Sequence, residues 1–197
     1  MGMKLGDKEI RTILHQWIKD NFDMRKYILD DEFRISDGFV VADVALIGTD
    51  LVGFEIKSDK DVLDRLTIQS MVYSNAFAEC FLVTTPKYAE KASLVVPDWW
   101  GVLTVEEIEG NLCLFEYRKG EENPDVTPLA VLQLLKKKEA ADLLRLVNSP
   151  ISNKKKSEIY LELMEKLQPD ELIYLSCLKV RARYHGRHAT LASKLLP

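Results

Sequence analysis

The chain has 197 residues, of which 47% are hydrophobic, which suits one domain with a buried core and a helical appendage. No apolar run approaches the roughly 20 residues of a membrane-spanning helix, and the N-terminus does not resemble a signal peptide. The three cysteines, Cys80, Cys113 and Cys177, are widely spaced and indicate neither a disulfide framework nor a zinc site. We therefore expect a cytoplasmic protein with no membrane partner.

The net charge of −4 is unevenly distributed along the chain. Residues 130–197 carry 13 lysines and arginines against 7 acids, whereas residues 1–129 carry 14 against 24. A nucleic-acid enzyme could use this layout, with carboxylates holding a metal and a basic tail holding phosphate. A helical tail with a solvated charged face is the alternative, and charge alone favours that alternative.

The hydrophobic pattern predicts alternating strands and helices, followed by helices only. Strands are expected over residues 33–36, 39–47, 51–57, 80–84, 101–105 and 112–117. Helices are expected over residues 7–22 with Asp7 as cap, from a capping box at Ser58 and Asp61 to about 77, and over 87–95, 128–147, 154–167, 170–183 and 188–195.

Strands separated by helices require some parallel pairing, whereas the hairpin over residues 39–57 is antiparallel. The sequence therefore predicts an α/β protein whose mixed β-sheet is flanked by helices. We assign residues 1–122 to this core and residues 123–197 to a basic helical C-terminal region that could pack on it.

Three ionisable residues converge in the predicted hairpin. Side chains alternate along a strand, so Glu55 and Lys57 point to one face and Phe54 to the other, into the core. Asp43 is the only charge in FVVADVALI, where a carboxylate is costly unless something compensates it. A turn near Gly48 places Asp43 roughly opposite residues 55–57.

This set of side chains suits phosphodiester hydrolysis. Asp43 and Glu55 offer the hard oxygen ligands that Mg²⁺ prefers, and the backbone carbonyl of Ile56 could be a further ligand. Lys57 could orient the attacking water and stabilise charge on the phosphate. The alternative is a cross-strand ion pair that neutralises itself, but the combined pattern is much rarer than Glu-x-Lys alone.

The next helix carries a polar stripe, with Asp61, Arg65, Gln69 and Tyr73 spaced four residues apart. Gln69 is expected to face the site. Arg65 and Tyr73 could contact DNA, or could instead be a surface pair with Asp61 and a packed ring. Other basic residues that could follow a phosphate backbone are Lys154, Lys155, Lys156, Arg181, Arg183 and Arg187.

The order Asp43, Glu55, Lys57, Gln69 resembles the PD-(D/E)XK, or restriction-endonuclease-like, nuclease superfamily. Within it, GFEIKSDKDVLDRLTIQSMVY followed by VPDWWGVLTVE resembles a small stand-alone family of bacteria and phages with no assigned function. The likeness covers residues 7–120 well. One departure is Ala42, which stands where the motif has a proline before its aspartate.

The resemblance implies a Mg²⁺- or Mn²⁺-dependent nuclease that cleaves DNA and leaves a 5′-phosphate. Asp43 and Glu55 would bind the metal and Lys57 would be the catalytic lysine. A further upstream acid often joins such a metal site. Glu32 is the candidate here, with Asp31 and Glu9 as rivals.

We therefore expect a DNA nuclease that acts in repair, phage genome processing or defence. Two alternatives remain, a non-catalytic DNA-binding module of the same fold and a protein-interaction or scaffold protein. Cleavage of both strands of a duplex often uses two active sites, so a homodimer fits this expectation, although no residue indicates it.

Overall fold

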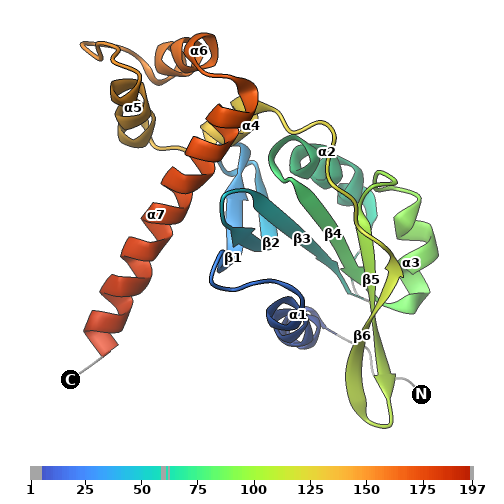
Figure 1. Ribbon diagram of the computed structural model, residues 1–197. Helices are drawn as coiled ribbons and strands as arrows, with labels where there is room; N and C mark the ends of the chain where they lie inside the picture. Colours follow the sequence, from blue (N-terminus) through green and yellow to red (C-terminus); the bar gives the residue numbers. More distant parts are fainter. Residues whose placement is uncertain (1–5, 59–60, 62, 196–197) are drawn as a thin grey trace.

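The computed structural model describes residues 6–58, 61 and 63–195, with side chains up to residue 185. Within these residues the chain forms one six-stranded sheet with helices on both faces (Figure 1). The strands are β1 (Ile28–Ile35), β2 (Val40–Ile47), β3 (Leu51–Lys57), β4 (Glu79–Thr84), β5 (Gly101–Ile108) and β6 (Asn111–Arg118). The helices are α1 (Asp7–Asn21), α2 (Leu66–Ala76), α3 (Pro86–Ser93), α4 (Pro128–Gln133), α5 (Lys137–Leu146), α6 (Lys156–Lys166) and α7 (Pro169–Leu195), with short 3₁₀ turns η1 (Ser36–Gly38) and η2 (Leu63–Arg65).

The sheet is mixed and its strands lie side by side in chain order. The pairs β1–β2, β2–β3 and β5–β6 are antiparallel, whereas β3–β4 and β4–β5 are parallel. The two parallel pairs are joined by crossovers that contain α2 and α3, because a parallel connection must return to the starting end of the sheet. This arrangement confirms the predicted fold class.

Helix α1 covers one face of the sheet. Its apolar stripe, Ile10, Leu14 and Ile18, is fully buried against apolar side chains of β2 to β5, including Phe54 and Phe81, whose rings stack with centroids 5.1 Å apart. Figure 1 shows α1 beneath the sheet, on the side opposite to α2 and α3. The burial of this stripe explains why the period of 3.6 residues was readable in the sequence.

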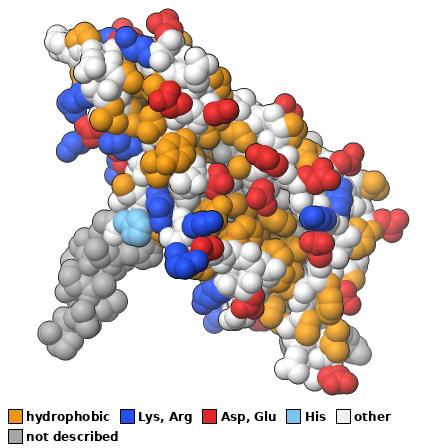
Figure 2. All heavy atoms as spheres, viewed as in Figure 1, with side chains coloured by type: hydrophobic (Ala, Val, Ile, Leu, Met, Phe, Trp, Pro, Cys, Tyr) orange, Lys and Arg blue, Asp and Glu red, His pale blue; other side chains and the backbone are white. Residues whose placement is uncertain are grey.

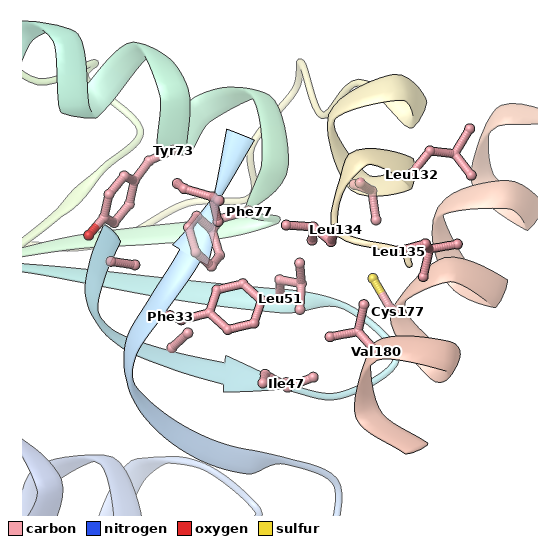
Figure 3. Packing of buried hydrophobic residues seen from close by; sticks show 14 of the residues in the cluster. Phe33, Ile47, Leu51, Tyr73, Phe77, Leu132, Leu134, Leu135, Cys177 and Val180 are labelled. Carbon is pink, nitrogen blue, oxygen red and sulfur yellow. The ribbon is translucent and has the colours of Figure 1, made fainter. Parts of the chain in front are cut away.

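The other face packs against α2, α3 and the C-terminal helices. Figure 3 shows Leu132, Leu135, Cys177 and Val180 meeting Leu51 and its neighbours on the sheet, within one continuous hydrophobic cluster. The helical region that follows the sheet is therefore tied to it by shared apolar burial. Among the described residues, no helix combines the length and apolar character needed to cross a bilayer.

Two predicted boundaries in the core were wrong. The strand expected over 33–36 begins at Ile28, because its first half alternates less clearly in polarity. Ser58 and Asp61 do form the expected local bonds, with the Asp61 carboxylate accepting from the Ser58 backbone N–H at 2.8 Å. However, Asp61 is not helical, the described helical residues begin at Leu63, and residues 59–60 and 62 lie outside the described part.

Two predictions in the C-terminal region were also wrong. The helix expected over 128–147 is divided into α4 and α5, because Lys136 is extended (φ −71°, ψ 153°) and its backbone N–H bonds to the Glu139 carboxylate. Conversely, the helices expected over 170–183 and 188–195 are one helix, α7. The predicted break near Pro150 is present between α5 and α6.

Candidate active site

The last residues of β3 present two charged side chains to α2. Glu55 is 1% exposed and Lys57 is 8% exposed, so both are buried among the strands and α2. The Lys57 Nζ lies 2.5 Å from Oε1 of Glu55 and 3.0 Å from Oε1 of Gln69. The Thr84 hydroxyl on neighbouring β4 also donates to the Lys57 backbone carbonyl at 2.8 Å. The structure therefore brings Gln69 to Lys57, as the stripe on α2 suggested.

Tyr73 holds the second oxygen of the Glu55 carboxylate. Its hydroxyl donates to Glu55 Oε2 at 2.7 Å, and the residue has no exposed surface. In Figure 3 this hydroxyl points away from the apolar cluster that surrounds the ring. Burial and the charge of Glu55 raise the pKa of Tyr73 well above its usual value, so the hydroxyl stays protonated. The expected DNA contact by Tyr73 was wrong, because a fully buried ring cannot reach a nucleic acid.

Asp43 lies where the alternation of faces along β2 slips. Val40 and Ala42 join the cluster on the α2 face, but the next residues on that face are Ala45 and Ile47. Two residues, Asp43 and Val44, lie between Ala42 and Ala45 where regular alternation would place one, so Asp43 occupies a local irregularity. Such irregularities redirect side chains and are common beside active sites.

The same slip occurs on β1 opposite Asp43. The strands pair Asp31 with Val44 and Phe33 with Ala42, which leaves Glu32 facing Asp43 between them. Glu32 has a left-handed backbone with φ 58°, which is costly for a residue with a Cβ atom. The Asp43 carboxylate is directed toward β3, where Oδ2 accepts a hydrogen bond from the Ile56 backbone N–H at 2.7 Å.

The environment of Asp43 disfavours its negative charge. Burial and the nearby charge of Glu55 raise the pKa of Asp43 to about 7, against opposing effects of the Ile56 N–H, Lys57 and Arg11. The two carboxylates are therefore close enough to repel each other, and the surrounding cations only partly offset that repulsion. A divalent cation placed between them would relieve it.

Arg11 of α1 is a residue that the sequence reasoning missed. Its guanidinium bonds to the Asp43 backbone carbonyl, lies 3.7 Å from Asp43 Oδ1 and lies 2.9 Å from Glu32 Oε1. Burial opposes the guanidinium charge, but the surrounding carboxylates raise the pKa of Arg11 overall. The available signal was the row Asp7, Arg11, His15 beside the apolar stripe of α1, because this spacing keeps all three residues on one face.

These groups open into one cleft of about 680 Å³. Asp43, Glu55, Ile56, Lys57 and Gln69 all contribute to its wall. The exposed side chains of Asp61 and Arg65 lie along the same cleft, as do Phe39, just before β2, and Val41, near the start of that strand. The cleft thus combines the buried carboxylate of Glu55 and the partly buried carboxylate of Asp43 with an exposed guanidinium.

The expected third metal ligand is not at this cleft. Glu32 is bonded to Arg11, the rival Asp31 bonds to Arg11 and His15, and the Glu9 carboxylate accepts from the Gly6 backbone at the start of α1. Within the described residues, no three acidic, histidine or cysteine side chains cluster so as to hold a metal ion.

The remaining donor set still fits a hard divalent cation. Asp43 and Glu55 supply two carboxylates at one cleft, and Mg²⁺ commonly uses one or two carboxylates and retains several waters. The raised pKa of Asp43, caused by burial and by Glu55, is the electrostatic signature of two acids that share too little positive charge. A ligand role for the Ile56 carbonyl stays a prediction.

Most basic residues proposed for DNA binding are engaged within the protein. Arg183 makes a two-pronged ion pair with Glu139, with Nη2 2.5 Å from Oε2, and also bonds to the Leu134 carbonyl. Lys154 pairs with Glu162, and Lys156 lies 3.4 Å from Asp37.

The remaining basic residues of that prediction lie apart from one another. Arg181 donates to the Arg25 carbonyl, at the opposite end of β1 from the cleft, and Lys155 is exposed at the start of α6. The Arg187 side chain lies outside the described residues. On the face shown in Figure 2, basic side chains lie among acidic ones.

Comparison with known proteins links the whole chain to a phage protein. The family described as "Bacteriophage P4 protein cII" matches residues 4–196. Protein cII of Enterobacteria phage P4 is 25% identical over 195 residues, which cover 99% of this chain and 74% of that protein. Among solved structures, the SPO1766 protein of unknown function from Silicibacter pomeroyi has 14% identity and a TM-score of 0.45, covering 77% of this chain and 98% of its own.

Proposed function

The chain belongs to the bacteriophage P4 protein cII family, and we propose that it is a metal-dependent nuclease that hydrolyses phosphodiester bonds of DNA. The observation that carries this proposal is the convergence of Asp43, Glu55 and Lys57 on one cleft. The resemblance of the order Asp43, Glu55, Lys57 and Gln69 to the PD-(D/E)XK pattern also supports it, because that resemblance is recognised in the sequence without reference to the structure.

The proposed roles follow from the contacts of each side chain. Asp43 and Glu55 would hold Mg²⁺ or Mn²⁺, with Asp43 fixed by the Ile56 N–H and Glu55 fixed by Tyr73. A bound divalent cation would supply a polarised phosphate oxygen, an acidified water and a stabilised leaving oxygen.

Lys57 is placed to act on the reacting phosphate. An ammonium has three N–H donors, and two of them are directed at Glu55 and Gln69. The third is left for a water or a phosphate oxygen in the cleft. Glu55 and Gln69 thus fix the position of a positive charge that would stabilise the extra negative charge of the transition state.

The proposal places this activity in the cytoplasm, on DNA during repair, phage genome processing or defence, with a homodimer as one assembly that would cut both strands. A non-catalytic DNA-binding module would need neither the two carboxylates nor Lys57 in one cleft. The buried Glu55–Lys57 pair is costly to maintain, since each charge loses its hydration. A retained catalytic use accounts for that cost.

The test is cleavage of single-stranded, double-stranded and branched DNA in Mn²⁺ and in Mg²⁺, with wild type compared to Lys57→Ala. Lys91→Ala removes an exposed lysine from α3 and serves as the matched control. We expect wild type and Lys91→Ala to cut at least one substrate and Lys57→Ala to cut none. Binding without cleavage by all three proteins would instead support the DNA-binding module.

A further inference from the structure

Phe39 is an aromatic ring that the protein holds in solvent at the edge of the candidate cleft. Its side chain is 70% exposed, and it lines the same cleft as Asp43 and Lys57. Single exposed apolar residues are ordinary on protein surfaces. Phe39 differs from Leu94, which is 83% exposed after α3, because Leu94 does not line the candidate cleft.

The turn before Phe39 has an unusual backbone. Ser36, Asp37 and Gly38 have φ values of 50°, 52° and 89°, so three successive residues are left-handed. This conformation costs energy at the two residues with a Cβ atom. The turn is closed by the Phe39 N–H, which donates to the Ser36 carbonyl at 3.0 Å, and Lys156 of α6 lies 3.4 Å from the Asp37 carboxylate. These two contacts therefore hold the turn that positions the Phe39 ring.

Phe39, Val41 and Asp43 all line the cleft, with Phe39 immediately before β2 and the other two residues on that strand. Four residues of chain span at most roughly 14 Å, so the Cα atoms of Phe39 and Asp43 are no farther apart than that. A DNA strand whose phosphate is at Asp43 would pass Phe39 within a few nucleotides.

We propose that Phe39 stacks on an unpaired base within a few nucleotides of the scissile phosphate, so that the substrate is single-stranded or locally unpaired DNA. This inference rests on the proposed nuclease function. Every base has a π face on which an aromatic ring can stack, and in a duplex those faces are covered by neighbouring base pairs. Arg65 and Lys57 provide positive charge in the same cleft for the backbone of that strand.

The test measures binding by Lys57→Ala protein, in which the DNA stays intact. A fluorescent oligonucleotide is titrated as a single strand and as a duplex of the same sequence. Adding Phe39→Ala should weaken single-strand binding by about tenfold or more, the usual effect of removing one stacking ring, and should change duplex binding little. Phe39→Trp should retain single-strand affinity, and Leu94→Ala, the matched loss of exposed apolar surface, should leave it unchanged.

Several outcomes would overturn the inference. These are equal single-strand affinities with and without Phe39, an equal loss for single strand and duplex, or no DNA binding at all. Cleavage by the otherwise wild-type protein separates this inference from the nuclease proposal. Cleavage that is unchanged by Phe39→Ala would preserve the nuclease and reject the stacking. Phe39-dependent binding without cleavage by wild type would preserve the stacking and reject the nuclease.

Discussion

The hydroxyl of Tyr73 donates a 2.7 Å hydrogen bond to Oε2 of Glu55, inside a part of the protein that solvent does not reach. Lys57 holds the other oxygen of the same carboxylate. Helix α2 therefore sets the orientation of a proposed metal ligand on β3. Because burial and Glu55 raise the pKa of Tyr73 well above its usual value, this hydroxyl remains a donor at neutral pH.

Tyr73→Phe should destabilise the protein without disturbing the packing of the ring. The substitution leaves a buried carboxylate oxygen without its donor, and hydrogen bonds to charged groups are worth about 1.5–3 kcal/mol. The free energy of unfolding in urea should fall by that amount. Tyr117→Phe, at a ring that is 53% exposed, is the control and should have little effect. Equal stabilities of the two variants would show that the Tyr73–Glu55 bond contributes nothing.

Asp43→Asn should stabilise the metal-free protein at neutral and alkaline pH. Burial and Glu55 raise the pKa of Asp43 to about 7 from 3.8, so its contribution to stability is full below about pH 4 and is lost as the pH rises through 7. The free energy of unfolding of the variant does not fall in this way. Its excess over the wild-type value should therefore grow to on the order of 4 kcal/mol by pH 8. Urea unfolding in EDTA between about pH 5 and 8 measures it. The exposed Asp20→Asn is the control, and a gap that stays constant with pH would contradict the assigned environment.

Mn²⁺ should raise the thermal unfolding temperature of wild type but not of Asp43→Asn or Glu55→Gln. A ligand that binds only the folded state stabilises it by about 2.7 kcal/mol at one hundred times its dissociation constant. Asp20→Asn should keep the full shift, and EDTA should reverse it. A shift of equal size in all four proteins would place metal binding elsewhere and would remove the main support for the nuclease proposal.

The sheet and the core of the site were predictable because their signals are local. Strand alternation placed Glu55 and Lys57 on one face, and helical spacing placed Gln69 above them. The turn between β2 and β3 fixed the neighbour of Asp43, whose carboxylate indeed bonds to the Ile56 N–H. Each of these inferences needed only residues within about one or two elements of each other.

The parts that the sequence did not predict depend on distant contacts. Arg11 contacts Asp43 from a position 32 residues earlier in the chain, and no local sequence pattern predicts that contact. The slip of β1 and β2 at Glu32 and Asp43 is a property of two strands together. Likewise, a count of basic residues could not tell that Arg183 was committed to Glu139, since this pair joins α5 to α7 across 44 residues.

Substitutions of Arg183 and Arg65 should distinguish an arginine that stabilises the fold from one that contacts nucleic acid. Arg183 and its partner Glu139 are only 16% and 18% exposed, so Arg183→Met leaves a largely buried carboxylate without its cation and should lower the free energy of unfolding by about 2 kcal/mol. Glu139→Leu added to Arg183→Met should recover part of the loss, because two apolar groups leave no unpaired charge, although the Lys136 N–H loses its acceptor. DNA affinity should not change in either protein.

Arg65→Ala should lower the affinity for DNA and leave the stability of the protein unchanged. Arg65 is exposed along the candidate cleft, so the variant should keep wild-type stability but bind single-stranded DNA more weakly, with a shallower dependence of affinity on salt. Affinity is measured by anisotropy over a salt series in the Lys57→Ala background. If Arg183→Met also reduced the salt dependence, Arg183 would contact phosphate after all, and the DNA path would have to extend from the cleft toward α7.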